Sequence, residues 1–93
     1  MSEKTRGKYS RTYKHVATGT VSQLVTENPK RVAVLVYNNG DQTVYILSAQ
    51  NLGILDGIPV AAGNSYENDT STATLWVIAA GGRQDLRVQV DGN

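Results

Sequence analysis

The sequence predicts an all-β fold, a small antiparallel β-sandwich or jelly-roll-like barrel of about six or seven strands. Short apolar segments rich in β-branched residues recur at close spacing, separated by turn-forming Asn, Asp, Gly and Pro. No segment shows a 3.6-residue apolar period longer than about two helical turns. The 93 residues leave room for one domain. We therefore expect a flexible basic N-terminal arm over residues 1–17 and the sandwich over residues 18–93.

The predicted arm contains almost no large aliphatic side chain, and Gly7 interrupts it. Residues 1–15 hold five basic side chains against one acidic one, a net charge of +4, whereas the remainder holds four against seven, a net charge of −3. Such an arm, with tyrosines as anchors, predicts contact with a partner, and a solvated terminus is the plain alternative. The predicted partner-binding residues are Lys4, Arg6, Lys8, Tyr9, Arg11, Tyr13 and Lys14.

The first half of the body predicts three strands. Residues 20–26 are β-branched and end before Pro29, which cannot continue a central ladder. Residues 31–38 contain six consecutive apolar positions, which predicts a strand covered on both faces. The Asn-Asn-Gly-Asp turn that follows tolerates positive φ, so we expect a hairpin with a return strand over residues 43–48.

The second half begins with an irregular segment, residues 50–64, of a length that is often functional or interfacial. Residues 58–60 predict a short edge strand that residues 64–67 continue. Residues 73–80 form a second near-continuous apolar run, again typical of a central strand. Residues 85–91 alternate cleanly and predict the closing strand. Its inward-facing residues are Leu86, Val88 and Val90.

The residue types predict no catalytic, cofactor or metal site, and hence no enzyme. Without cysteine and with one histidine, the chain lacks the ligands of a structural zinc site. On a mobile arm, His15 would have no neighbour to fix its tautomer. The acidic residues fall in or beside predicted turns, where aspartate caps the backbone. The apolar runs are far shorter than the roughly 20 residues of a membrane span, so we expect no membrane contact.

A chain of this length buries only about 60% of its unfolded surface, so its core is thin and self-association is the expected supplement. Trp76 lies in the middle of an apolar strand, which predicts a core or subunit contact. The alternative is a sugar-binding platform in which Tyr37, Tyr45 and Tyr66 lie near this tryptophan after strand pairing.

Three segments in order, residues 31–47, 57–63 and 73–82, resemble those of small β-sandwich virion structural proteins of tailed bacteriophages. The segments are Arg-Val-Ala-Val-Leu-Val-Tyr-Asn-Asn-Gly followed by Val-Tyr-Ile-Leu, then Gly-Ile-Pro-Val-Ala-Ala-Gly, then Ala-Thr-Leu-Trp-Val-Ile-Ala-Ala-Gly-Gly. The resemblance implies a non-enzymatic virion component: a capsid decoration or cement protein, a head fibre, or a head–tail accessory.

Together these observations predict a capsid decoration protein that is made in the bacterial host cytoplasm and resides in the virion. We expect it to form a homo-oligomer, with a trimer favoured, and to bind the major capsid protein or another virion protein partly through its arm. Removing residues 1–15 should then leave a folded body that no longer binds particles. The alternatives are a receptor- or carbohydrate-binding tip module and, less favoured, a small nucleic-acid-binding β protein that uses the basic arm.

Overall fold

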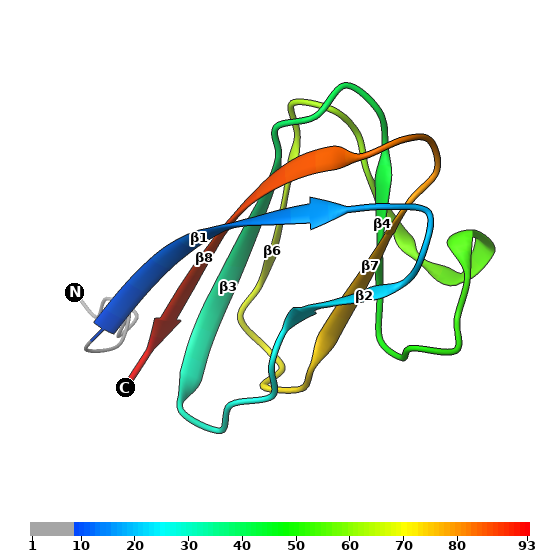
Figure 1. Ribbon diagram of the computed structural model, residues 1–93. Helices are drawn as coiled ribbons and strands as arrows, with labels where there is room; N and C mark the ends of the chain where they lie inside the picture. Colours follow the sequence, from blue (N-terminus) through cyan, green and yellow to red (C-terminus); the bar gives the residue numbers. More distant parts are fainter. Residues whose placement is uncertain (1–8) are drawn as a thin grey trace.

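The computed structural model describes residues 9–93 (Figure 1). Within this range the chain forms eight strands and one short 3₁₀ helix. In chain order these are β1 (Tyr9–Ala17), β2 (Ser22–Val25), β3 (Arg31–Asn38), β4 (Val44–Leu47), η1 (Ile54–Asp56), β5 (Ile58–Val60), β6 (Ser65–Asn68), β7 (Leu75–Ala79) and β8 (Gln84–Gly92). No helix in this range is long and apolar enough to cross a membrane.

The strands form two four-stranded antiparallel sheets. Sheet A has the order β1-β8-β3-β6, and sheet B has the order β2-β7-β4-β5. Each strand of the first half pairs with one of the second half, as β1 with β8, β2 with β7, β3 with β6, and β4 with β5. The chain is thus one long hairpin whose successive strand pairs alternate between the sheets, which is the jelly-roll arrangement. The predicted all-β sandwich is confirmed.

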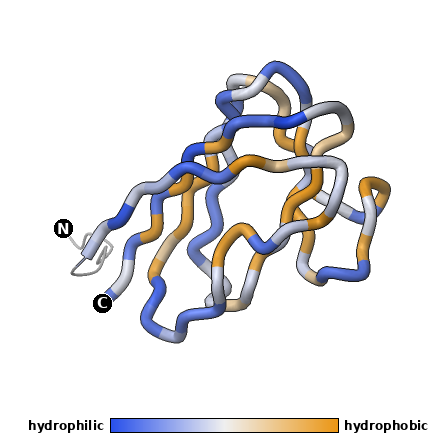
Figure 2. Tube along the Cα trace, in the orientation of Figure 1, coloured by the Kyte–Doolittle hydropathy of each residue, from blue (hydrophilic) through white to orange (hydrophobic). Residues whose placement is uncertain are grey.

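The core lies between the inner faces of the two sheets and is formed mainly by inward-facing residues of β3, β4, β7 and β8. Sheet A contributes Val34 and Val36 of β3 together with the predicted inward-facing residues of β8. Sheet B contributes Val44 and Ile46 of β4 and Val77 of β7. Figure 2 shows apolar positions along both layers, and a further apolar segment at the tip of the loop that carries η1. The alternation predicted for the closing strand is confirmed.

The predicted hairpin between residues 31–38 and 43–48 is wrong, because β3 belongs to sheet A and β4 to sheet B. The buried Asn38 amide donates to the carbonyl oxygens of Gln42, at 2.8 Å, and of Val60, at 2.9 Å. From β8, the buried Gln84 Oε1 accepts the backbone N–H groups of Asp41 and Gln42. These two side chains satisfy the backbone of the connection, so the chain crosses between the sheets here instead of reversing within one.

The prediction of a flexible arm does not hold for residues 9–17, which form β1 and pair with all nine residues of β8. Most side chains over residues 9–15 of β1 are polar or charged and exposed, so this edge strand has the composition of a solvated tail. The folded body therefore includes residues 9–17. Residues 1–8, which carry three of the predicted partner-binding residues, lie outside the described part of the chain.

The two continuous apolar runs have different surroundings on their outer faces. On sheet B, Ile78 of β7 is 9% exposed, and Leu47 of β4 is 1% exposed. On sheet A, Leu35 and Tyr37 of β3 are 37% and 39% exposed. The prediction that both faces of the strand over residues 31–38 are covered is therefore wrong for a single copy of the chain.

Candidate functional site

The described partner-binding residues all lie on β1, which is an edge strand of sheet A (Figure 1). Tyr9, Arg11 and Tyr13 occupy alternate positions, and the Tyr13 hydroxyl reaches sheet B. Lys14 falls on the opposite, outer face of the same sheet. Arg11 and Lys14 consequently do not form one basic patch, which weakens the nucleic-acid alternative for this part of the chain. Lys4, Arg6 and Lys8 lie outside the described residues.

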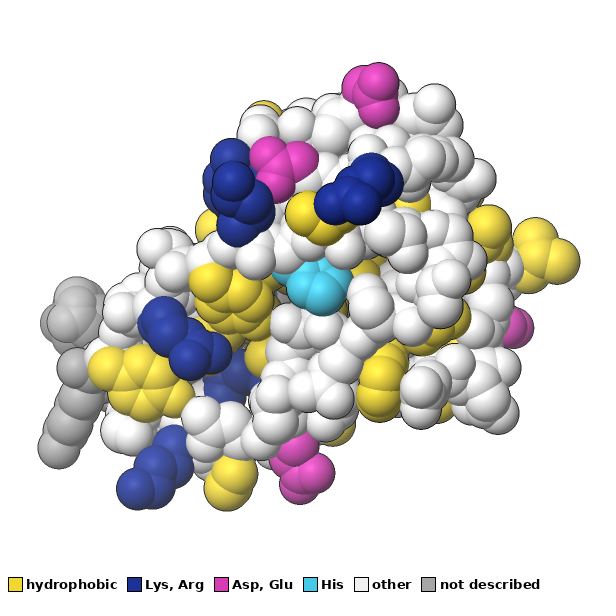
Figure 3. Space-filling view, in the orientation of Figure 1, with side chains coloured by type: hydrophobic (Ala, Val, Ile, Leu, Met, Phe, Trp, Pro, Cys, Tyr) yellow, Lys and Arg dark blue, Asp and Glu magenta, His cyan; other side chains and the backbone are white. Residues whose placement is uncertain are grey.

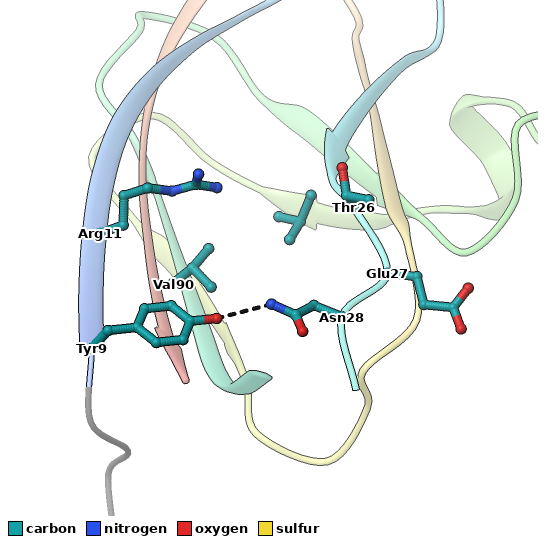
Figure 4. A pocket seen from close by; sticks show the side chains of 7 residues that line it. Tyr9, Arg11, Thr26, Glu27, Asn28 and Val90 are labelled. Atoms are coloured by element: carbon teal, nitrogen blue, oxygen red, sulfur yellow. Dashed lines mark hydrogen bonds between the residues drawn. The ribbon is translucent and has the colours of Figure 1, made fainter. Parts of the chain in front are cut away.

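An open groove separates β1 from the segment that follows β2 (Figure 4). Its cavity has a volume of about 430 Å³. We call it the edge groove. It is lined by Tyr9, Arg11, Val25, Thr26, Glu27, Asn28 and Val90. The amide of Asn28 donates a hydrogen bond of 2.9 Å to the Tyr9 hydroxyl, which spans the lower end of the groove in Figure 4. The groove lies where neither sheet continues, because β1 and β2 are both edge strands.

The Arg11 side chain supplies the positive charge of the edge groove. Its guanidinium lies 5.1 Å from the centre of the Tyr13 ring, a cation–π contact. Within residues 9–93, no carboxylate forms an ion pair with Arg11. The carboxylate of Glu27 points away from the cavity (Figure 4). A guanidinium can bind a carboxylate of another molecule in the bidentate manner that arginine favours.

Arg31, at the start of β3, connects the segment that follows β2 to the segment that precedes β7. It is only 4% exposed, and its guanidinium donates to the carbonyl oxygens of Thr26, Ser71 and Ala73 at 2.7–3.1 Å. The Nε atom is buried without a hydrogen-bond partner in the described part of the chain. Burial lowers the pKa of Arg31. The sequence analysis identified Arg31 only as the start of a strand, because two of the three carbonyls that it binds, those of Ser71 and Ala73, are distant in sequence.

Two further side chains of β1 tie it to β2 across the edge of the sandwich. The Tyr13 hydroxyl donates to the Leu24 carbonyl oxygen at 2.7 Å, and burial raises the pKa of Tyr13. The His15 Nε2 lies 2.9 Å from the Ser22 Oγ, and burial lowers the pKa of His15. Figure 3 shows the histidine at the surface between hydrophobic side chains. The expectation that His15 has no neighbour is wrong, because Ser22 lies within hydrogen-bond distance of its Nε2; the Ser22 hydroxyl can donate or accept, so this contact is compatible with either tautomer.

Trp76 lies half-buried on β7, opposite Leu47, and its side chain belongs to the outer face of sheet B. Tyr45 shares this face at a diagonal position, because it pairs with Ile78. The other two tyrosines of the proposed sugar-binding platform lie elsewhere. Tyr37 is on the outer face of sheet A, and Tyr66 packs against the core. The structure thus assembles only one of the three tyrosines beside the tryptophan.

Comparisons with known proteins show little likeness. No family model matches the chain, and no curated protein sequence matches it. One solved structure, from work on Bacillus endospore appendages as a family of disulfide-linked pili, is similar with a TM-score of 0.47 and 16% sequence identity. That likeness covers 100% of this chain and 98% of the other.

Proposed function

We propose that the chain is a non-enzymatic structural subunit of a bacteriophage particle that associates with copies of itself and binds a protein of the head lattice at the edge groove. The support for the particle is the ordered resemblance of residues 31–47, 57–63 and 73–82 to phage virion proteins. Jelly rolls occur in viral capsid proteins, but also in lectins, so the fold alone favours neither class.

The observation that carries the proposed contact is the edge groove beside an unpaired edge strand. Tyr9 offers an aromatic surface that is 40% exposed, and Arg11 offers a charge with no described carboxylate partner. Within residues 9–93 no strand pairs with the outer backbone edge of β1, so an added strand can pair there. An extended segment of a partner protein can therefore add to this edge and place an acidic side chain on Arg11.

The experiment starts with particles released from the bacterium that encodes the chain, banded by density and analysed by quantitative mass spectrometry. We expect the chain to co-purify with the particle at a fixed ratio to the major capsid protein. Its absence from the particle band, with the chain present elsewhere in the lysate, would contradict the virion proposal.

The groove is tested by adding purified variants to particles stripped of the protein. Arg11→Glu should reduce occupancy at least tenfold, because it reverses the charge that meets the partner's carboxylate. Arg83→Glu makes the same charge change in the exposed turn before β8 and should bind as the wild type does. Equal occupancy for both variants would exclude the edge groove as the contact. Deleting residues 1–15 is not a suitable test, because it removes most of β1.

A further inference from the structure

Side chains from alternate residues of β1 bridge the gap between the two sheets at this edge of the sandwich. The residues are Tyr9, Tyr13 and His15, which contact Asn28, Leu24 and Ser22 in that order. Arg11 lies between the two tyrosines in this series and, within residues 9–93, makes no hydrogen bond to the opposite edge. The edge groove is therefore an opening at one residue position in an otherwise bridged edge.

The ring of Tyr9, at the lower end of this opening, lies directly over Gly92, its register partner on β8. A Cβ on Gly92 would overlap the Cζ and the hydroxyl oxygen of Tyr9. Gly92 does not have a positive φ, so its own backbone conformation does not require glycine. Glycine inside a strand often marks the close approach of another group. Here that group is the Tyr9 ring.

Asn28, which holds the Tyr9 hydroxyl, is itself fixed by three backbone partners. Its N–H donates to the Thr72 carbonyl oxygen at 3.0 Å, and its carbonyl oxygen accepts the Arg31 N–H at 2.9 Å. Its Oδ1 accepts the Lys30 N–H at 3.0 Å. The side-chain NH₂ group then donates to the Tyr9 hydroxyl at 2.9 Å. Tyr9 is thus held between a fixed amide and the backbone of β8.

The two tyrosines limit what can enter the edge groove. Figure 4 shows Arg11 pointing into the cavity above the bond between Tyr9 and Asn28. Tyr9 and Tyr13 are four residues apart, which is about 13 Å along a strand. A strand added to β1 directs every second side chain to this face, at a spacing of about 7 Å. Only the side chain opposite Arg11 meets the opening, because those on either side of it meet the tyrosines.

The charge in the edge groove selects an acidic side chain, and the chain itself is a poor source of one. Of the two charged residues that line the cavity, Arg11 points into it and Glu27 points away (Figure 4). Residues 1–8 hold three basic residues and one acidic residue, so their net charge of +2 is repelled by Arg11. The edge strands β1, β2, β5 and β6 hold one acidic residue, Glu67, which shares the outer face of sheet A with Leu35. A different protein is therefore the better source.

We infer that Asn28 and Gly92 are positioning residues that hold Tyr9 as the lower wall of the edge groove, so that the groove admits one acidic side chain of a partner protein. This inference rests on the particle contact in the proposed function and identifies the residues that shape it. Because the wall is in place before the partner arrives, little side-chain order remains to be lost on binding.

The positioning of Tyr9 is tested without particles, by urea unfolding of the full chain in a double-mutant cycle of Tyr9→Ala and Gly92→Ala. The added methyl group displaces a ring only where the ring is present. Gly92→Ala should therefore raise the unfolding equilibrium constant at least about fivefold more in the wild-type background than in the Tyr9→Ala background. The same change in both backgrounds would overturn the inference.

The effect of this wall on binding is measured as occupancy of particles stripped of the protein, with circular dichroism to establish that each variant is folded. Tyr9→Phe keeps the ring and removes the bond to Asn28, so it should lower the affinity by about threefold to tenfold. Tyr37→Phe is the matched control, because Tyr37 is 39% exposed against 40% for Tyr9 and lies on the outer face of sheet A. Gly92→Ala should weaken binding at least as much as Tyr9→Phe does.

The acidic occupant is tested with Asn28→Asp, whose carboxylate still accepts the Lys30 N–H and accepts a hydrogen bond from the Tyr9 hydroxyl. The wall is kept, but the new carboxylate competes with the partner for Arg11. Occupancy should fall at least about fivefold with little change in the unfolding equilibrium constant. Asn51→Asp adds the same charge at an exposed position of the loop over residues 48–57 and should bind as the wild type does.

The outcomes separate this inference from the proposed function. Full occupancy by Arg11→Glu would contradict the particle contact, and the coupling between Tyr9 and Gly92 would still report on the wall. Reduced occupancy by Arg11→Glu, with wild-type occupancy by Tyr9→Phe and Gly92→Ala or by Asn28→Asp, would overturn the inference and leave the contact in place. Glu3→Gln and Glu67→Gln should bind as the wild type does, and a changed occupancy for either would assign the occupant to the chain itself and overturn the inference.

Discussion

The outer faces of the two sheets differ in a way that their sequences do not. Both central strands derive from nearly unbroken apolar runs, β3 in sheet A and β7 in sheet B. On sheet B, Leu47 and Ile78 are buried, and Gly57 at the end of the loop over residues 48–57 packs against Leu47. On sheet A, Leu35 and Tyr37 remain more than one-third exposed.

The difference shows that an unbroken apolar run predicts burial of both faces of a strand but does not identify the segment that buries the outer face. In sheet B the connection between β4 and β5 is long enough to fold back over its own sheet. In sheet A no described segment lies over Leu35 and Tyr37. The same apolar pattern therefore gives a covered outer face in sheet B and, within residues 9–93, an uncovered one in sheet A.

The largest expected effect on the free energy of unfolding is that of Leu47→Ala on sheet B, compared with Leu35→Ala on sheet A. Leu47→Ala should reduce the free energy of unfolding by about 2–5 kcal/mol, because it leaves a cavity in a covered site. Leu35→Ala should change it by about 0.5 kcal/mol or less, because that side chain already contacts solvent. Urea unfolding at a concentration where the chain is monomeric measures both. Similar losses for the two variants would mean that a single copy already covers sheet A.

A smaller loss of unfolding free energy is expected from Gly57→Ala, which adds a methyl group between the loop over residues 48–57 and sheet B. The Cβ of Gly57→Ala would lie 2.8 Å from both the Leu47 Cδ2 and the Tyr45 Cβ, and 3.1 Å from the Ile46 carbonyl oxygen. Pushing the loop off sheet B should cost about 1–3 kcal/mol in unfolding free energy. Gly53→Ala, in the same loop with no atom within 4 Å of its Cβ, is the matched control and should be nearly neutral. Equal changes would show that the loop does not pack on the sheet.

The strands of the core were predictable because burial of one or both faces of a strand requires apolar residues at regular positions in the sequence. The alternation over residues 85–91 identified the inward face of β8, and the apolar runs located β3 and β7. The strand β1 was missed because most of it is exposed on both faces: Lys14 and its polar neighbours meet solvent on the outer face, and Tyr9 and Arg11 line the open edge groove on the other. Turn residues alone did not distinguish a hairpin from a crossing between sheets, which buried Asn38 and Gln84 determine.

The candidate site was predictable only in part. The sequence identified Tyr9 and Arg11 as interaction residues from the charge and aromatic content of the N-terminal segment. The edge groove also requires Asn28 and its neighbours, which reach Tyr9 only because β1 and β2 form adjacent edges of the two sheets. The shallow depression on the outer face of sheet A likewise joins residues of β1, β3 and β8, and no local pattern relates them.

The smallest predicted effect is a pH dependence of the free energy of unfolding that arises from His15, at the edge of the sandwich where β1 contacts β2. Burial lowers the pKa of His15 below its ordinary value of 6.5. The unfolded chain therefore binds more protons than the folded chain near that value, and the free energy of unfolding should fall as the pH is lowered from 7 to 5. Because His15 is only half-buried, solvent screening keeps the loss well below that of Leu47→Ala.

Urea unfolding of the wild type and of His15→Gln at pH 7, 6 and 5 measures this contribution. The glutamine amide can still hydrogen-bond to Ser22 but does not titrate, so the variant should show a flatter pH dependence. The hydrogen bond from Arg87 lowers the pKa of Asp85, whose contribution is lost only below about pH 4 and stays outside this window. An identical slope in the variant would show that another group causes the loss. Leu35→Ala should keep the wild-type slope, because Leu35 lies on the opposite face of sheet A from His15 and does not affect the burial of that ring.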